Sequence, residues 1–135
     1  MSEAPDSNPI VRQWVEKAEN DLRNAEHTLT LEEKCPFDTV CFHAQQCAEK
    51  YLKALLLAAD IEPPRTHNLR VLMQLIPPEM PLGLNPQDIL ILNRYSVEAR
   101  YPADWDPIIR ADFEEVLGIA QRVRAAVRRY LTWVH

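Results

Sequence analysis

Glycine is almost absent from this chain of 135 residues, which contains two glycines and eleven prolines. A β fold that reverses direction many times usually needs more glycine than this, so the scarcity argues against such a fold. The sequence also lacks an apolar run of about eighteen residues, the length that a membrane-spanning helix needs, and it has no signal-peptide pattern over residues 1–9. We therefore expect a helical protein of the cytoplasm that does not associate with membranes.

Patterns that hold metals or activate nucleophiles are missing as well. The three cysteines, Cys35, Cys41 and Cys47, are an odd number and favour reduced thiols. No paired Cys-x2-Cys unit accompanies them, and no histidine stands beside a cysteine or serine with a third orienting group. A glycine-rich phosphate loop is absent too, which argues against a classical NTPase. We expect neither a metal nor another cofactor.

Length and composition are sufficient for one compact domain. Apolar residues make up 47% of the chain, enough for a core that needs no metal or disulfide. The formal net charge is −5, so contact with nucleic acid would require a local basic patch. We expect residues 1–8 to be a loose segment and residues 9–135 to form a single domain.

The longest periodic pattern lies between residues 37 and 59. Apolar residues recur there at spacings of three and four, which places them on one helical stripe: Val40, Ala44, Cys47, Ala48, Tyr51, Leu52, Leu55 and Ala59. His43, Gln46, Lys50 and Lys53 form the opposite line at the same spacing. The pattern predicts a helix that packs inward with its stripe and presents a cationic, amide-rich line outward.

Asparagine–proline pairs and further prolines predict where the other helices begin and end. Asn8-Pro9 and Asn85-Pro86 are typical helix starts, because asparagine caps a helix and proline fits its first position. We expect helices over about 9–31, 37–59, a short stretch capped by Thr66, 86–100, and 107 onward. Since no strand pattern appears, the sequence predicts an all-α fold, an up-and-down bundle of four or five helices around the second one.

One carboxylate falls on an apolar stripe. Asp21 lies between the core positions of the first helix, where a charge is costly unless donors or cations meet it. Arg100, Lys50 and His67 are the candidate partners. We favour a structural polar pair of Asp21 with Arg100; in the alternative, Asp21 orients Arg100 as a phosphate ligand.

Four motifs together resemble the HEPN domain family (higher eukaryotes and prokaryotes nucleotide-binding). They are Trp14-x3-Ala18-x2-Asp21-Leu22-x2-Ala25, Phe42-x2-Gln45-Gln46-x2-Glu49-Lys50-x2-Lys53-Ala54-Leu55, Pro64-x-Thr66-His67-x-Leu69 and Ala99-Arg100-Tyr101-Pro102. The resemblance spans roughly residues 10–131. It implies a helical bundle that often dimerises. Apolar residues outside the stripes, Val15, Leu57 and Trp133, are candidates for a dimer face or for ordinary scattered surface positions.

The family resemblance implies two kinds of function. Many stand-alone bacterial members are encoded beside a minimal nucleotidyltransferase, as a toxin–antitoxin or accessory pair. Others are metal-independent RNases, in which an arginine is followed after four to six residues by a histidine. This sequence departs from that motif, because Arg94 is followed at the first allowed position by Ala99, then by Arg100 and Tyr101. We therefore do not expect RNase activity of the family type.

These observations lead to a prediction of function. We expect a non-catalytic, HEPN-like homodimer that binds a nucleotide or RNA phosphate, or that docks a minimal nucleotidyltransferase. The candidate nucleotide- or phosphate-binding residues are His43, Lys50, Lys53, Arg65, His67, Arg94, Arg100 and Tyr101, with Tyr101 or Tyr95 stacking on a base. The plain alternative for the line on the second helix is a solvated face in which Glu49 and Lys53 pair at i, i+4.

Two other functions stay open. One is an RNase toxin with a non-standard active site, which would combine Arg94 or Arg100 with His43 or His67. The other is a dimeric scaffold without a ligand.

Overall fold

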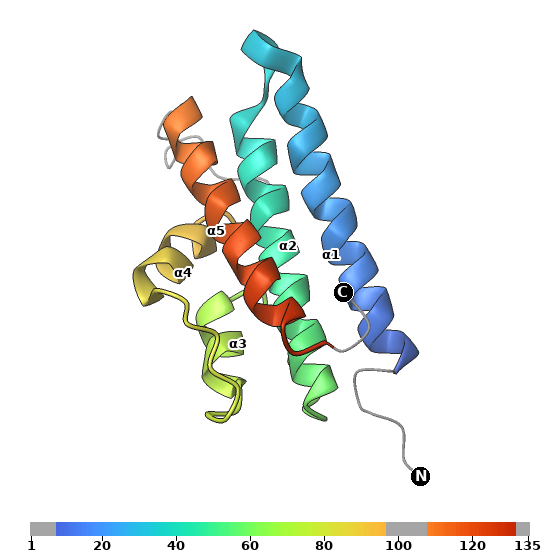
Figure 1. The fold of residues 1–135 in the computed structure, drawn as a ribbon. Coiled ribbons are helices and arrows are strands. Elements are labelled where there is room, and N and C mark those ends of the chain that lie inside the picture. Colours follow the sequence, from blue (N-terminus) through green and yellow to red (C-terminus); the bar gives the residue numbers. More distant parts are fainter. Residues whose placement is uncertain (1–7, 97–107, 132–135) are drawn as a thin grey trace.

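A computed structural model describes residues 8–96 and 108–131, and throughout these ranges every regular element is a helix (Figure 1). The elements are α1 (Pro9–Thr28), the 3-10 helix η2 (Leu29–Lys34), α2 (Phe37–Ala58), α3 (Leu69–Leu75), α4 (Pro86–Asn93) and α5 (Arg110–Arg128). The prediction of an all-α fold is confirmed. None of the described helices combines the length and the hydropathy that crossing a membrane would require.

Helix α2 is the centre of the arrangement. It packs against α1 on one side and α5 on another, and it also contacts α3 and α4 (Figure 1). The short helices α3 and α4 lie on the side of the bundle away from α1. The second helix therefore organises the fold, as the sequence pattern predicts.

Capping side chains explain most helix starts. The Oδ1 atom of Asn8 accepts a hydrogen bond from the backbone N–H of Ile10 at 2.8 Å, and the Oδ1 atom of Asn85 accepts one from Gln87 at 2.9 Å. Both asparagine–proline predictions are confirmed. The third cap differs from the prediction, because Asn68 caps α3 by accepting from the Arg70 N–H at 3.0 Å.

Three predicted boundaries are wrong. The first helix leaves the α conformation after Thr28 and continues as η2, with a break at Glu32 where φ is 53°. Helix α4 ends at Asn93 instead of Arg100. The backbone N–H groups of Arg94 and Tyr95 donate to the carbonyl oxygens three residues earlier, as in a 3-10 turn, so the α-helical pattern stops there. Helix α5 begins at Arg110, where Asp112 accepts from the Ile109 N–H at 2.9 Å.

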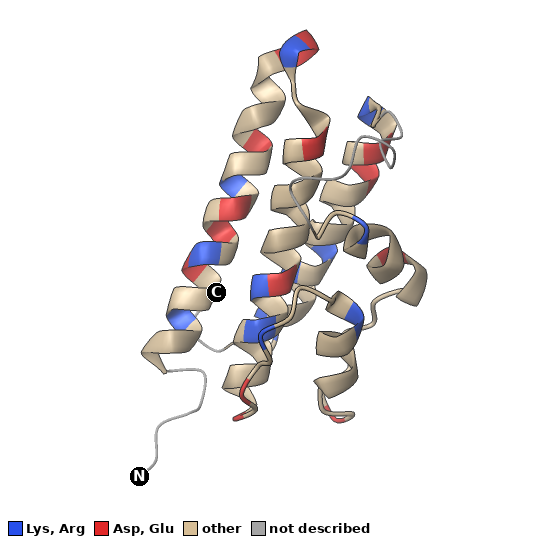
Figure 2. Ribbon diagram, turned by 180° about the vertical axis from the view of Figure 1, so that it is seen from behind, with Lys and Arg blue, Asp and Glu red and all other residues tan. Residues whose placement is uncertain are grey.

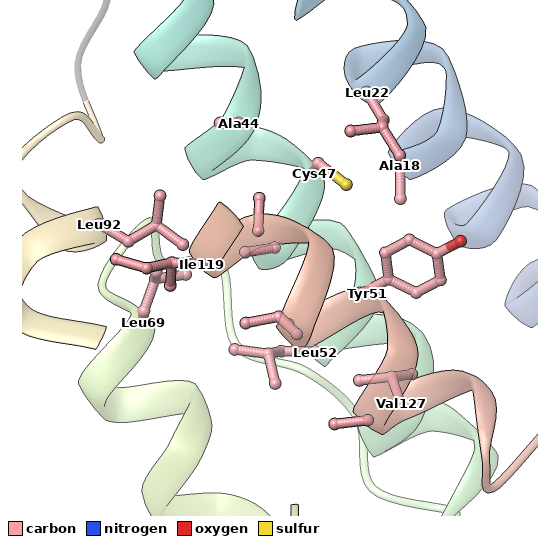
Figure 3. Close-up of a cluster of buried hydrophobic side chains, with 14 of the residues drawn as sticks. Ala18, Leu22, Ala44, Cys47, Tyr51, Leu52, Leu69, Leu92, Ile119 and Val127 are labelled. Atoms are coloured by element: carbon pink, nitrogen blue, oxygen red, sulfur yellow. The ribbon is translucent and has the colours of Figure 1, made fainter. Parts of the chain in front are cut away.

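The core is built on both sides of α2. Figure 3 shows Cys47, Tyr51 and Leu52 of α2 close to residues of α1 and α5 that include Ala18, Leu22, Ile119 and Val127. Tyr51 and Leu52 are fully buried. A buried side chain of such size contributes about 1.5–3 kcal/mol to folding. Val15, one of the candidates for a dimer face, is 4% exposed and belongs to this core.

Candidate functional site

Polar side chains of α2 meet α1 on one side and the segment that leads to α3 on the other. Figure 2 shows charges of both signs close together on α2 beside that segment. We call this set the α2 polar face and define it by seven residues: Asp21, His43, Gln46, Glu49, Lys50, Lys53 and His67. Four of them, His43, Lys50, Lys53 and His67, belong to the phosphate-binding set predicted from the sequence.

Asp21 is the centre of the first half of the face. It is 7% exposed, and each of its carboxylate oxygens meets a different side chain of α2. The Nδ1 atom of His43 lies 2.8 Å from Oδ1, and the Nζ atom of Lys50 lies 2.5 Å from Oδ2. Lys50 was among the predicted partners, whereas His43 was not. The predicted pair with Arg100 stays a prediction, because residue 100 lies outside the described residues.

Glu49 is the centre of the second half. Its side chain is 3% exposed, and its two oxygens lie 3.2 Å from the Nζ atom of Lys53 and 2.9 Å from the Nδ1 atom of His67. Gln45 fixes the same histidine a second time, by donating from Nε2 to the His67 carbonyl oxygen at 3.1 Å. His67 is therefore held at its backbone and at its ring, although its side chain is 70% exposed.

Gln46 extends the second half. Its Nε2 atom donates to Oε1 of Gln45 at 2.8 Å and lies 3.4 Å from Oε1 of Glu49. The two halves repeat one arrangement, in which a buried carboxylate is held between a lysine and a histidine. No buried side-chain nitrogen or oxygen in the described ranges lacks a hydrogen-bond partner. Burial of these charges is thus compensated, as it must be in a stable fold.

The predicted outward line of cations is wrong for Lys53. The side chain of Lys53 is 8% exposed and its Nζ atom lies 5.4 Å from the centre of the Trp14 ring. Lys50 remains 23% exposed and His43 27% exposed, but both are paired with Asp21. The line is covered because α2 has neighbours on both flanks of it, which a single helical pattern cannot reveal.

The carboxylates also decide which ring nitrogens are available. An ionised carboxylate only accepts hydrogen bonds, so His43 and His67 each donate from Nδ1 to Asp21 and Glu49 respectively. This leaves Nε2 of each ring for a ligand. A histidine oriented in this way can accept a proton or, once protonated, bind a phosphate oxygen.

Two exposed arginines lie close to the turn that carries His67. Asn93, at the end of α4, accepts from the Leu69 N–H at 2.9 Å and donates to Asn68 at 3.1 Å. These bonds place Arg94, the next residue, beside the start of α3. Arg65 precedes His67 by two residues. Within the described part of the chain, neither Arg65 nor Arg94 has an ion pair or a hydrogen bond from its guanidinium.

The remaining predicted contacts are not brought together by the described residues. Tyr95, a candidate for stacking on a base, is half-buried and packs against the core. Arg100 and Tyr101 lie outside the described residues. The sequence reasoning missed the roles of Gln45 and Glu49 in holding His67. A signal was present, since these two polar residues stand four apart on the edge of an apolar stripe.

A second charged cluster connects α1, α2 and α5. Glu19 of α1 lies 2.8 Å from Nη2 of Arg124 and 2.8 Å from Nη1 of Arg128. Arg128 also donates to the Tyr51 hydroxyl at 3.2 Å. Burial raises the pKa of Glu19, but hydrogen bonds and charges from Arg124, Tyr51 and Arg128 outweigh that effect and leave its pKa below the ordinary value. We call these four residues the Glu19 cluster.

The three cysteines lie inside the fold. All three are buried, and burial raises the pKa of Cys47 to about 12, so its thiol stays protonated. Within the ranges that the structure describes, no three His, Cys, Asp or Glu side chains gather closely enough to hold a metal ion.

Comparison with known proteins shows the family. Residues 11–130 match the HEPN domain, so this chain belongs to the HEPN domain family. A crystal structure of TT1696 from Thermus thermophilus is similar with a TM-score of 0.75 and 29% sequence identity, over 90% of this chain and 98% of that one. The resemblance drawn from the four motifs is confirmed.

A second solved structure shares the fold. ST0689, an archaeal HEPN homologue, is similar with a TM-score of 0.62 and 23% identity, again over 90% of this chain and 98% of that one. At this identity the likeness concerns the fold alone. No curated protein matches the chain.

Proposed function

We propose that this HEPN domain protein binds the phosphate of a nucleotide or of RNA at the α2 polar face and does not cleave it. The observation that carries the proposal is the repeated arrangement of the face. Two histidines from different segments are each held through Nδ1 on a buried carboxylate, so their Nε2 atoms take no part in these bonds. A purely structural pair would not need an exposed ring such as that of His67.

The charges of the face indicate which side chains would provide affinity. Asp21 and Glu49 compensate the charges of Lys50 and Lys53, so these lysines add little net attraction for an anion. The exposed arginines at positions 65 and 94 have no such compensation among the described residues. Arginine is well suited to the task, because its planar fork binds phosphate oxygens in pairs.

The sequence around Arg94 supports binding without cleavage. The RNases that the family resemblance implies place a histidine after the arginine, with four to six residues between the two. This chain has Ala99, Arg100 and Tyr101 at those positions. Association with a second copy of the chain or with a minimal nucleotidyltransferase, which the resemblance also implies, is compatible with this site and is not required by it.

Binding of a fluorescein-labelled RNA oligonucleotide and of ATP, measured by anisotropy and calorimetry in EDTA, tests the proposal. We expect the double variant Arg65→Ala/Arg94→Ala to lose at least about tenfold in affinity, which corresponds to about 1.4 kcal/mol. Arg23→Ala is the matched control, since Arg23 is an exposed arginine of α1 that bonds only to Asn20 among the described residues.

Three outcomes are distinguishable. Equal binding by the double variant and by Arg23→Ala would contradict a phosphate site at this face. RNA shortening in EDTA that stops in Arg94→Ala would favour the non-standard RNase. If neither binding nor shortening of the RNA is observed, the remaining function is the dimeric scaffold without a ligand.

A further inference from the structure

An apolar hollow lies between α3 and α4, apart from the α2 polar face. It has a volume of about 350 Å³, and its lining includes Arg70, Met73, Leu84, Pro86, Ile89 and Leu90. A second hollow of about 290 Å³ continues along the connector between the two helices and shares Met73 and Leu84 with the first. We call the two hollows together the α3–α4 groove.

An apolar side chain that lines the groove stays exposed among the described residues. Leu90 of α4 lines the first hollow and is 39% exposed, whereas the exposed Val71 and Leu75 of α3 line neither hollow. The buried residues of the same helix are Ile89 and Leu92. Exposed apolar side chains that gather around a hollow mark an interaction site more often than scattered ones do.

The charge at one end of the groove selects the kind of partner. Arg70 is exposed and has no ion pair or hydrogen bond from its guanidinium within the described ranges. Asp88, the acidic residue of α4, is already paired with Arg122 of α5 at 3.0 Å. Glu79 is exposed on the connector, which lines the other hollow. An occupant with a carboxylate would therefore be attracted to the Arg70 end and repelled at the other.

The shape of the groove favours a helix as the occupant. One hollow between two short helices and a neighbouring one along their connector can receive successive apolar anchors, which a helix presents at i, i+3 and i+4. Met73 and Met80 line the groove, and unbranched methionine side chains adapt their shape to a partner. Aliphatic anchors with one acidic residue a turn away would match both the apolar lining and Arg70.

We propose that the α3–α4 groove docks an amphipathic, acidic helix of a partner protein, whose apolar residues fill the groove and whose carboxylate pairs with Arg70. This docking does not depend on phosphate binding at the α2 polar face. Its success or failure in experiment is therefore separate from that of the proposed function.

Charge reversal provides a direct test. The probe is a synthetic peptide of about fourteen residues, roughly four turns, with leucines at i, i+3, i+4 and i+7 and glutamates on its polar side. A second peptide carries lysines in place of the glutamates. Amide chemical-shift mapping should place the acidic peptide on α3 and α4 and give it an affinity at least about tenfold above that of the basic peptide. Arg70→Glu should reverse this preference, so that the basic peptide binds more tightly than the acidic one.

An apolar variant and its control complete the experiment. Leu90→Ser should weaken binding of the acidic peptide at least about fivefold, because it removes an anchor of the groove. Leu31→Ser, on η2, changes a leucine that is 51% exposed and should leave the affinity unchanged.

Other results would overturn the proposal. Equal binding of both peptides to the wild type and to Arg70→Glu would show that the groove has no charge preference. Chemical-shift changes outside α3 and α4, or no changes at millimolar peptide, would remove the docking site. Binding of decanoate without binding of either peptide would replace the helix by a small amphipathic anion.

Discussion

Glu19 and Asp21 lie two residues apart on α1, yet they belong to different charged clusters. Two residues correspond to about 200° around a helix, so the two carboxylates face nearly opposite directions. Glu19 meets Arg124 and Arg128 of α5, whereas Asp21 meets His43 and Lys50 of α2. One helix thus supports both the Glu19 cluster and the α2 polar face.

The two clusters differ in the chemistry of their cations. Arginine keeps its charge at every accessible pH and holds a carboxylate in a fixed, forked geometry. Lysine is a single point charge on a long stem, and histidine changes its charge between about pH 5 and 8. The Glu19 cluster is therefore suited to a permanent connection between helices. The α2 polar face is suited to a site whose charge and contacts respond to a ligand.

The exposure of their side chains also distinguishes the two clusters. In the Glu19 cluster the Tyr51 hydroxyl is enclosed, and burial, offset in part by Arg128, raises the pKa of Tyr51 to about 12. In the α2 polar face the carboxylates are buried, but the ring of His67 is 70% exposed. Arg124 and Arg128 of the Glu19 cluster are only 35% and 26% exposed, so the most accessible side chain of the two clusters belongs to the α2 polar face.

The most damaging change should be Glu49→Ala. It leaves the ammonium of Lys53, 8% exposed, without its partner, and breaking a buried pair in this way costs about 3–5 kcal/mol. Urea unfolding followed by circular dichroism measures the loss. Glu49→Gln is the shape-matched comparison and should lose less, since its amide oxygen can still accept a hydrogen bond. Equal stability of Glu49→Ala and the wild type would contradict the pairing.

Removal of Asp21 should have a smaller effect. Asp21→Ala removes two hydrogen bonds, but Lys50 and His43 are both partly exposed and can bind water in its place. We expect a loss of about 1.5–3 kcal/mol. Glu26→Ala, an exposed position of the same helix, should stay within about 0.5 kcal/mol of the wild type. A melting temperature unchanged by Asp21→Ala would remove this carboxylate from the stabilising network.

The smallest effect concerns the pH dependence of the Glu19 cluster. Because the pKa of Glu19 lies below its ordinary value of 4.5, its stabilisation is present above that pH and is lost as the pH falls through the lowered value. Glu19→Gln lacks this contribution, which we expect to be about 1 kcal/mol at pH 7. The difference in the free energy of unfolding between wild type and variant should therefore shrink from pH 7 to pH 4 and again to pH 3. A constant difference across these pH values would exclude the assigned role of the charge.

Local patterns allowed most of the fold to be predicted. The capping prediction at Asn8 and Asn85 is confirmed, because an asparagine acts on backbone N–H groups only two residues away. The central position of α2 also follows from its own sequence. The end of α4 was not predictable in the same way, since nothing in the local pattern indicates that the chain turns at Arg94 rather than after Arg100.

The candidate site was predictable in its residue types but not in its contacts. The sequence indicated His43, Lys50 and Lys53 as one line and noted that Asp21 needs a partner. It did not indicate that Lys53 is buried or that His67 is anchored on Glu49, 18 positions earlier. Those facts depend on how the segment after α2 folds back over it.

The sequence by itself determined that this chain forms helices, which faces of them are apolar, and that it belongs to the HEPN domain family. These properties follow from periodicity and from short-range hydrogen bonds, which act over a few residues. Only the tertiary structure decided which charges meet, which lysine loses contact with water and where an apolar groove stays open. The physical reason is that an ion pair or a hollow is formed by side chains from separate helices, and its energy depends on their distance in space rather than on their spacing in the chain.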